Sequence, residues 1–161
     1  MSNAPIQRRL VAILAADVVG YSRLMEQDEA TTLTELKVRW SEIVEPLVAS
    51  HQGRIFKRIG DGMLVEFGSA VAAVECAVEL QKAMAAANDD AAAERAIVLR
   101  IGINLGDVMV DGSDLYGAGV NVASRIEGLA DPGGVAISSA VHEHVHGRLS
   151  TDFLDGGSHE V

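Results

Sequence analysis

An uninterrupted apolar run, Leu10–Ala16, ends abruptly at Asp17 near the beginning of the chain. Seven residues are too few for most helices, so the run predicts a strand that is buried on both faces of a sheet. Residues 1–9 are polar, and we set them apart as an N-terminal segment from a folded domain at residues 10–161. A chain of 161 residues corresponds to one domain with a substantial core.

Two amphipathic helices and a hairpin are predicted in the first half of the chain. Apolar residues recur at helical spacing over 29–50, where Pro46 should cause a kink or an early end. Residues 54–67 predict two short strands around Gly60-Asp61-Gly62, because Asp-Gly suits a tight turn. Ser69 can cap a second helix that runs to about Ala87.

The second half adds strands and two further helices. Strands are predicted at 97–104, 107–111 and 135–137, and helices at about 119–129 and 139–146. The resulting order, β-α-β-β-α-β-β-α, is typical of the α+β class with a ferredoxin-like split βαβ core (βαββαβ) and extra C-terminal elements. Such a core is an antiparallel sheet with its first two helices on one face.

The composition excludes several classes of function. The 13 Lys and Arg residues against 23 Asp and Glu residues give a net charge of −10, which repels nucleic acid phosphates. No apolar run approaches the roughly 20 residues of a membrane span. Cys76 is the single cysteine, which rules out an internal disulfide and fits a reducing compartment. We therefore expect a cytoplasmic protein that binds neither nucleic acid nor a membrane.

Asp17 and Asp61 form the first candidate site. Each alone is explained by a turn, because Asp17 follows a strand and Asp61 lies in a hairpin. In a split βαβ fold, however, the first strand lies beside the central hairpin, so the two carboxylates converge. Close carboxylates repel each other unless a cation lies between them, and oxygen ligands favour Mg²⁺ or Mn²⁺. Backbone amides around Gly20 and the following helix start could then hold phosphate oxygens.

Residues 114–125 form the second candidate site. Asn121 and Arg125 are four residues apart, so on a helix they project from the same face. An Asn and an Arg in this arrangement are also typical of a solvated helix face. Glycines just before the helix, at 117 and 119, allow a ligand or another chain to approach the backbone closely.

Four ordered segments together resemble one family, the class III nucleotidyl cyclases. The segments are Ala16–Ser22, Phe56–Gly62, Arg100–Gly106 and Asp114–Arg125, and they lie within residues 10–146. The likeness is greatest to bacterial soluble adenylate cyclases. It implies that the chain is the catalytic domain of an adenylate or guanylate cyclase.

The resemblance implies a role for each motif residue. By motif, Asp17 and Asp61 resemble two aspartates that bind two Mg²⁺ or Mn²⁺ ions per site, and Lys57 and Asp114 resemble a purine-recognising pair. Asn121 resembles the residue that positions the ribose, and Arg125 the arginine that stabilises the transition state. The remaining substrate-binding candidates are the residues of the loop after Asp17, namely Val18, Val19, Gly20, Tyr21 and Ser22. In the family, one chain supplies the metal aspartates and its partner supplies the other residues, so we expect a homodimer with two shared sites.

Hydrogen-bond logic favours ATP as the substrate. Lys57 only donates and an ionised Asp114 only accepts, while adenine presents an acceptor at N1 and a donor at its amine. Guanine presents the reverse pattern, so the pair predicts an adenylate cyclase that makes 3′,5′-cyclic AMP and pyrophosphate. Guanylate cyclase activity, and a cyclase-like regulatory or dimerisation domain that binds nucleotide without turnover, remain as alternatives.

One feature of the family pattern is missing. The resemblance implies a triphosphate-binding lysine on a late strand, after a stretch like Asp152–Val161. The sequence ends there, and no lysine follows Lys82. We therefore expect the domain to be truncated at its C-terminal end.

Overall fold

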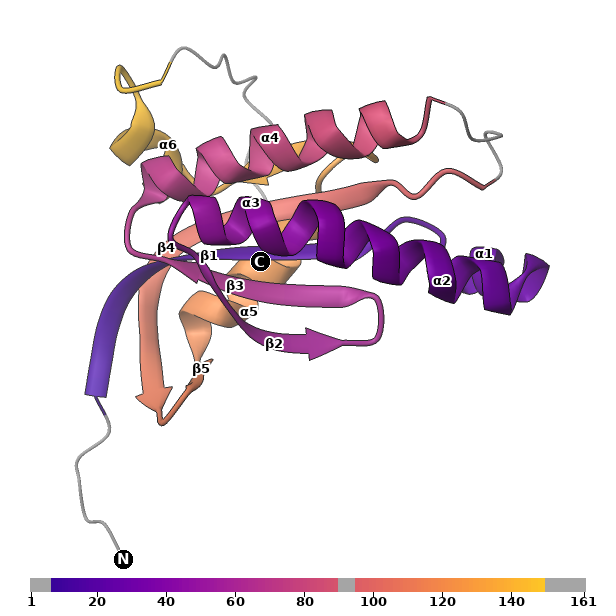
Figure 1. Cartoon of the computed structure of the whole chain (residues 1–161). Helices are drawn as coiled ribbons and strands as arrows, with labels where there is room; N and C mark the ends of the chain where they lie inside the picture. Colours follow the sequence, from indigo (N-terminus) through magenta and orange to yellow (C-terminus); the bar gives the residue numbers. More distant parts are fainter. Residues whose placement is uncertain (1–6, 90–94, 150–161) are drawn as a thin grey trace, which may run out of the picture.

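The computed structural model describes residues 7–89 and 95–149, and a mixed sheet runs through its centre (Figure 1). The middle strand is β1 (Gln7–Val18). It pairs antiparallel with β3 (Gly62–Phe67) on one side and with β4 (Leu99–Asp111) on the other. β1 is thus paired on both edges from Ala12 to Ala16, and it continues to Val18 with β4 as its partner.

Two short strands form the edges of this sheet. β2 (Arg54–Ile59) pairs with β3, and β5 (Asp114–Tyr116) pairs with β4, which gives the order β2-β3-β1-β4-β5. A further strand, β6 (Val135–Ile137), pairs parallel with β4. The first four strands along this path have the order of the predicted split βαβ core, so the predicted fold class is confirmed.

Helices cover the two faces of the sheet unequally (Figure 1). In the described part of the chain, the first face carries five α-helices and one π-helical segment, η1. They are α1 (Tyr21–Gln27), α2 (Glu29–Arg39), η1 (Trp40–Val44), α3 (Glu45–Ser50), α4 (Ala70–Ala87) and α6 (Ser139–Val145). The opposite face carries α5 (Ala118–Glu127). Part of that second face, near β2 and β3, therefore has no helix over it within the described residues.

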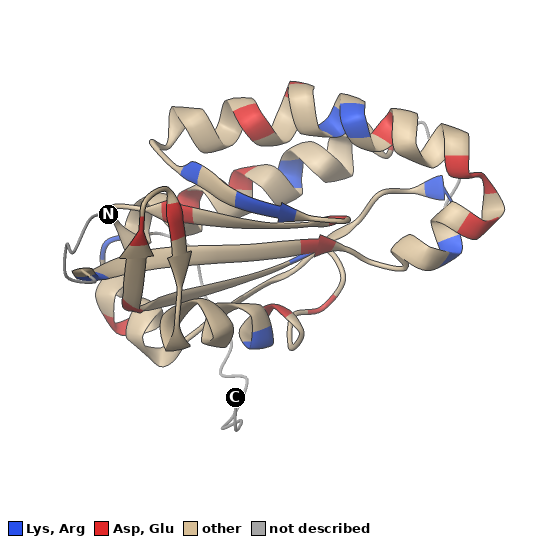
Figure 2. Ribbon diagram, turned by 90° about the horizontal axis from the view of Figure 1, so that it is seen from below, with Lys and Arg blue, Asp and Glu red and all other residues tan. Residues whose placement is uncertain are grey.

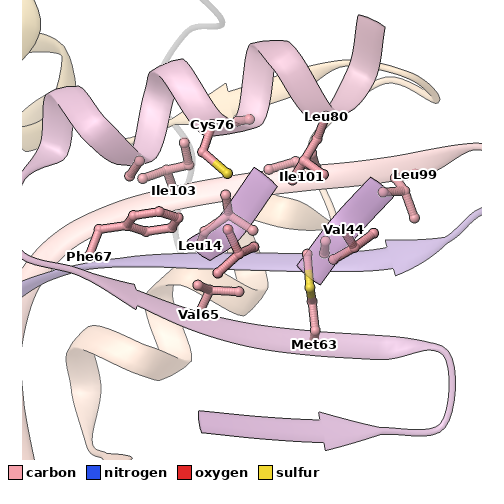
Figure 3. Close-up of a cluster of buried hydrophobic side chains, with 14 of the residues drawn as sticks. Leu14, Val44, Met63, Val65, Phe67, Cys76, Leu80, Leu99, Ile101 and Ile103 are labelled. Atoms are coloured by element: carbon pink, nitrogen blue, oxygen red, sulfur yellow. The ribbon is translucent and has the colours of Figure 1, made fainter. Parts of the chain in front are cut away.

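The strand β1 explains why the apolar run at its centre is continuous. Ala12, Leu14 and Ala16 pack into the larger core under α4, while Ile13 and Ala15 pack into a smaller core under α5. Side chains alternate between the faces of a strand, so a strand buried on both faces needs apolar residues at every position. Figure 3 shows the larger core between α4 and the sheet.

The structure changes the predicted bounds in the first half of the chain. β1 begins at Gln7, so residues 7–9, which the sequence set apart from the domain, belong to the strand. Their side chains are exposed, which is why a polar sequence is compatible with pairing there. The predicted helix at 29–50 contains a π-helical turn, η1, just before Pro46. Because Pro46 has no N–H to donate, the regular helical hydrogen bonds cannot continue unchanged.

The predicted strands at 97–104 and 107–111 are in fact one strand, β4. Its pairing with β1 continues without a break from Leu99 to Val110, although Gly106 interrupts the apolar alternation. The next strand is instead β5, which we did not predict. The capped helix that begins after Ser69 is confirmed, and Oγ of Ser69 accepts the N–H of Ala72. The predicted truncation concerns the C-terminal end, after residues 152–161, and these lie outside the described residues.

Charged residues are interspersed over the elements (Figure 2), and β2 carries three of the basic ones. In the part of the chain that the structure describes, no helix has both the length and the apolar character needed to cross a bilayer.

Candidate active site

The structure brings Asp17 and Asp61 together. Asp17 is the penultimate residue of β1, and Asp61 lies in the turn between β2 and β3. The backbone N–H of Val18 donates a 2.9 Å hydrogen bond to Oδ2 of Asp61. The turn packs closely on β1 here, because a Cβ atom on Gly62 would lie 3.3 Å from the carbonyl oxygen of Ile59 and 3.4 Å from that of Ala16. The convergence expected from the split βαβ topology therefore occurs within one chain.

Asp17 also has the property that a cation ligand needs. Its Oδ1 atom is buried without a hydrogen-bond partner, which is costly for an oxygen that carries negative charge. Among residues 7–89 and 95–149, no three His, Cys, Asp or Glu side chains form a ready-made metal cluster. The two carboxylates of Asp17 and Asp61 fit Mg²⁺ or Mn²⁺, because such ions commonly bind one or two carboxylates and complete their shell with phosphate oxygens and water.

The sequence analysis missed a third carboxyl group at this place, that of Glu127. Glu127 is the last residue of α5 and is buried. Burial, a hydrogen bond with Asp17 and the negative charges of Asp17 and Asp61 raise the pKa of Glu127 to about 8, while the positive charge of Arg100 opposes the shift. Glu127 therefore remains protonated at neutral pH when no cation is bound.

A signal in the sequence could have revealed Glu127. It lies seven residues after Val120 and four after Ala123, and both of these are buried in the smaller core. That spacing places its side chain on the buried stripe of the helix rather than on the solvated face. A lone acidic residue on an apolar stripe is uncommon and points to a special environment.

Three contacts seat α5 directly on β4. Gly102 lies under the end of the helix, where a Cβ atom would come within 2.2 Å of the backbone nitrogen of Glu127. At the other end, the buried Nδ2 of Asn104 donates to the carbonyl of Gly119 at 3.1 Å. A Cβ atom on Gly119 would lie 2.5 Å from the carbonyl oxygen of Asp107. The position of α5 is thus determined at both ends.

A pocket of about 310 Å³ opens beside the two aspartates. Its lining includes Asp17, Asp61 and Lys57, together with Glu127. Asn121 and Arg125, which we predicted for the same site, do not line it. Both are exposed on α5, whereas Lys57, which we also expected from a partner chain, lines the pocket of its own chain.

Lys57 and Asp114 meet although they lie on opposite edge strands of the sheet. Lys57 is on β2 and Asp114 begins β5. Nζ of Lys57 lies 3.4 Å from Oδ2 of Asp114, and both side chains are partly exposed. An exposed ion pair of this kind adds little stability, and its outward position leaves donor and acceptor accessible to a ligand.

The loop after Asp17 has fewer available amides than the sequence suggested. The N–H of Val18 is bonded to Asp61, and the N–H of Val19 donates to the carbonyl of Val98 at 2.8 Å. Gly20 follows in the left-handed conformation, with φ of 64°. Tyr21 and Ser22 begin α1, where N–H groups have no acceptor within the helix. The amides suited to an anion are therefore those of Gly20, Tyr21 and Ser22.

The chain was compared with known proteins and structures. Residues 5–161 match the family model described as "Adenylate and Guanylate cyclase catalytic domain". The chain is 69% identical over its whole length to "Putative adenylate cyclase 3" of Rhizobium meliloti and 35% identical over 87% of its length to "Adenylate cyclase" of Streptomyces coelicolor. It spans 27% and 35% of the lengths of these two proteins.

Crystal structures give the same family. An adenylate/guanylate cyclase/hydrolase from Silicibacter pomeroyi superimposes with a TM-score of 0.91 at 43% identity, covering 98% of this chain and 91% of that one. The guanylyl cyclase Cya2 superimposes with a TM-score of 0.81 at 27% identity, covering 93% and 85%. The sheet order, the paired aspartates and these matches lead to one conclusion. The chain belongs to the adenylate and guanylate cyclase catalytic domain family.

Proposed function

We propose that this chain is the catalytic domain of an adenylate cyclase, which converts ATP to 3′,5′-cyclic AMP and pyrophosphate. The observation that carries the proposal is the meeting of Lys57 and Asp114 at 3.4 Å. In the reaction, the ribose 3′-oxygen loses its proton and forms a bond to the α-phosphorus. The bond between the α-phosphorus and the pyrophosphate oxygen breaks.

The Lys57–Asp114 pair supports adenine as the base. The ammonium group of Lys57 can donate to N1 of adenine, and the carboxylate of Asp114 can accept from its exocyclic amine. Guanine would present a donor to the ammonium group and an acceptor to the carboxylate. A polar site that leaves such groups unpaired discriminates strongly between ligands.

Asp17 and Asp61 are the residues that would hold the divalent cations. The buried, unpartnered Oδ1 of Asp17 supports this assignment. When bound, the cations would lower the pKa of the 3′-hydroxyl and neutralise charge on the phosphates. The amides of Gly20, Tyr21 and Ser22, directly after β1, would donate to phosphate oxygens.

Asn121 and Arg125 would act from a second copy of the chain. Both are exposed on α5 and absent from the lining of the pocket that contains Asp17 and Asp61, as an interface role requires. From there, Asn121 would orient the ribose and Arg125 would stabilise the charge that builds on the α-phosphate oxygens. A two-fold symmetric dimer would then contain two equivalent sites.

The test is the initial rate of cyclic nucleotide formation from ATP and from GTP with Mn²⁺. The protein assayed contains these residues and continues past Val161. We expect cyclic AMP as the main product, no activity in Asp17→Ala and Asp61→Ala, and unchanged activity in Glu75→Gln, which removes an exposed carboxylate on α4. Saturable ATP binding without product would instead identify a regulatory domain, and a preference for GTP would identify a guanylate cyclase.

A further inference from the structure

Arg54 links the two parts of the sheet that carry Lys57 and Asp114. Its Nη1 atom donates a 2.7 Å hydrogen bond to the carbonyl of Ser113, the residue immediately before Asp114. Arg54 itself lies three residues before Lys57 on β2. One side chain therefore joins the strand of Lys57 to the turn that precedes Asp114.

A β-bulge makes this geometry possible. Arg54 pairs with Glu66 and Ile55 with Val65, but the next paired residue is Lys57, opposite Leu64. Phe56 is thus an extra residue in β2. In a regular strand, residues 54 and 57 would point to opposite faces, because side chains alternate. The extra residue restores Lys57 to the face of Arg54, toward β5 and α5.

The neighbours of β2 support this reading of the two faces. Arg58, one residue after Lys57, stacks over the ring of Trp40 at 4.9 Å on the side of the first helical layer. Phe56 and Leu64 pack against the smaller core on the side of α5. Lys57, which pairs with Leu64, is therefore directed away from Arg58.

A second contact holds the guanidinium group of Arg54 in position. Its Nε donates to Oε1 of Glu66, whose carboxylate also accepts a 2.8 Å bond from Nη2 of Arg9. The carboxylate of Glu66 is largely buried, with 14% of its side chain exposed. Arg54 is thus fixed by β3 on one side while it holds the β4–β5 turn on the other. The planar, rigid guanidinium group suits such a double contact.

The turn that Arg54 holds is short and leaves Asp114 little independent freedom. Asp111 pairs with Asp114, so only Gly112 and Ser113 connect β4 to β5. Gly112 has φ of 60°, which is typical of tight hairpins. A movement of the Ser113 carbonyl would therefore move Asp114 with it.

We propose that Arg54 is a positioning residue that sets the spacing of Lys57 and Asp114 and thereby the base preference of the site. Arg54 need not touch the nucleotide. Without its bond to Ser113, the two edge strands would separate and the donor and acceptor would no longer match one base. Because the inference rests on the proposed cyclase function, its test includes a readout that does not need turnover.

The experiment compares Arg54→Gln with Arg9→Gln. Both variants remove one guanidinium group from Glu66, but only the first removes the bond to Ser113. For Arg54→Gln we expect the KM for ATP to rise about five- to tenfold, the kcat to stay within about twofold, and the ATP to GTP preference in kcat/KM to fall about tenfold. Arg9→Gln should keep all three values within about twofold. Arg54→Lys, which keeps the charge but not the fork of donors, should fall between them.

A double-mutant cycle separates positioning from general destabilisation. In an Asp114→Asn background the base preference no longer depends on the carboxylate, so adding Arg54→Gln should not lower it further. The inference would be overturned if the effects of Arg54→Gln and Asp114→Asn on the base preference multiplied in the double variant. An Arg54→Gln protein with unchanged KM and base preference would also overturn it. If the parent protein makes no cyclic nucleotide, the cyclase proposal fails; equilibrium binding of ATP and GTP to the same variants then tests Arg54, with the same expected loss of preference.

Discussion

Asp61 anchors the end of the central strand, because its Oδ2 atom accepts the N–H of Val18 at 2.9 Å. The residue proposed to bind metal therefore also has a structural role. The variants Asp61→Asn and Asp61→Ala separate the two roles, since an amide oxygen can still accept the bond. We expect both to abolish activity, but only Asp61→Ala to lower the free energy of unfolding, by about 1 kcal/mol. Urea denaturation measures this, and equal losses of stability in both variants would argue against the anchor.

The buried Oδ1 of Asp17 predicts a trade between stability and metal binding. Asp17→Asn removes a buried negative charge, and the amide oxygen can still accept the hydrogen bond of Glu127, so the metal-free variant should be at least as stable as the parent. Mn²⁺ should raise the melting temperature of the parent and leave that of the variant unchanged. Thermal unfolding in EDTA and in excess Mn²⁺ compares the two. A variant that Mn²⁺ stabilises as much as the parent would remove Asp17 from the metal site.

Glu127 predicts a pH dependence of stability in the metal-free protein. Its pKa is raised from 4.5 to about 8 on folding, so between these pH values the folded chain holds a proton that the unfolded chain has released. The contribution of Glu127 to the free energy of unfolding is therefore fully present below pH 4.5 and falls as the pH rises toward 8. Glu127→Gln does not titrate, so relative to the parent its free energy of unfolding should gain about 3 kcal/mol between pH 5.5 and pH 8.5. Urea titrations in EDTA at both pH values give the difference, and parallel curves would contradict the shift.

The proposed sharing of the site between two chains predicts complementation between inactive variants. Asp17→Ala lacks one half of each site and Arg125→Ala the other, so each homodimer should be inactive. In an equal mixture, half of the dimers are mixed and each mixed dimer has one intact site, which gives about a quarter of the parent activity. Activity of the mixture is measured after the chains have exchanged. A mixture as inactive as its components would show that the residues act within one chain.

The contact between Gly102 and α5 predicts a large effect of one methyl group. In Gly102→Ala the new Cβ would lie 2.2 Å from the backbone nitrogen of Glu127, so the helix must move. We expect a loss of about 2–3 kcal/mol in stability together with a loss of activity, because α5 carries Asn121 and Arg125. Gly68→Ala is the matched control, since its Cβ would meet nothing within 4 Å. Equal stability of the two variants would disprove the close packing.

The parts of the fold that depend on local pattern were predictable. A run such as Leu10–Ala16 has one compatible environment, and a cap such as Ser69 acts within its own turn. The predicted bounds of a strand were less accurate where pairing with a distant strand determines where it begins or ends. β1 extends to Gln7 and β4 continues through Gly106 because each is the partner of the other, and no local signal records that.

The candidate site shows the same division. Asp17, Asp61, Lys57 and Asp114 could be named from ordered motifs, and topology alone indicated that the two metal candidates converge. Glu127 was missed because its importance comes from burial against β4, which depends on packing. The bulge at Phe56 was equally invisible, since it is defined by the register of β2 on β3. Properties that need two strands to be aligned cannot be read from one of them.

The order of the strands also has a consequence for how such a domain can diverge. Asp17 lies one residue before the end of the central strand, where it pairs with β4. Lys57 and Asp114 lie on the two outermost strands of the β2-to-β5 path, where a substitution disturbs fewer neighbours. In the roles proposed above, base preference and metal binding would therefore depend on different strands, so that a change in one need not alter the other.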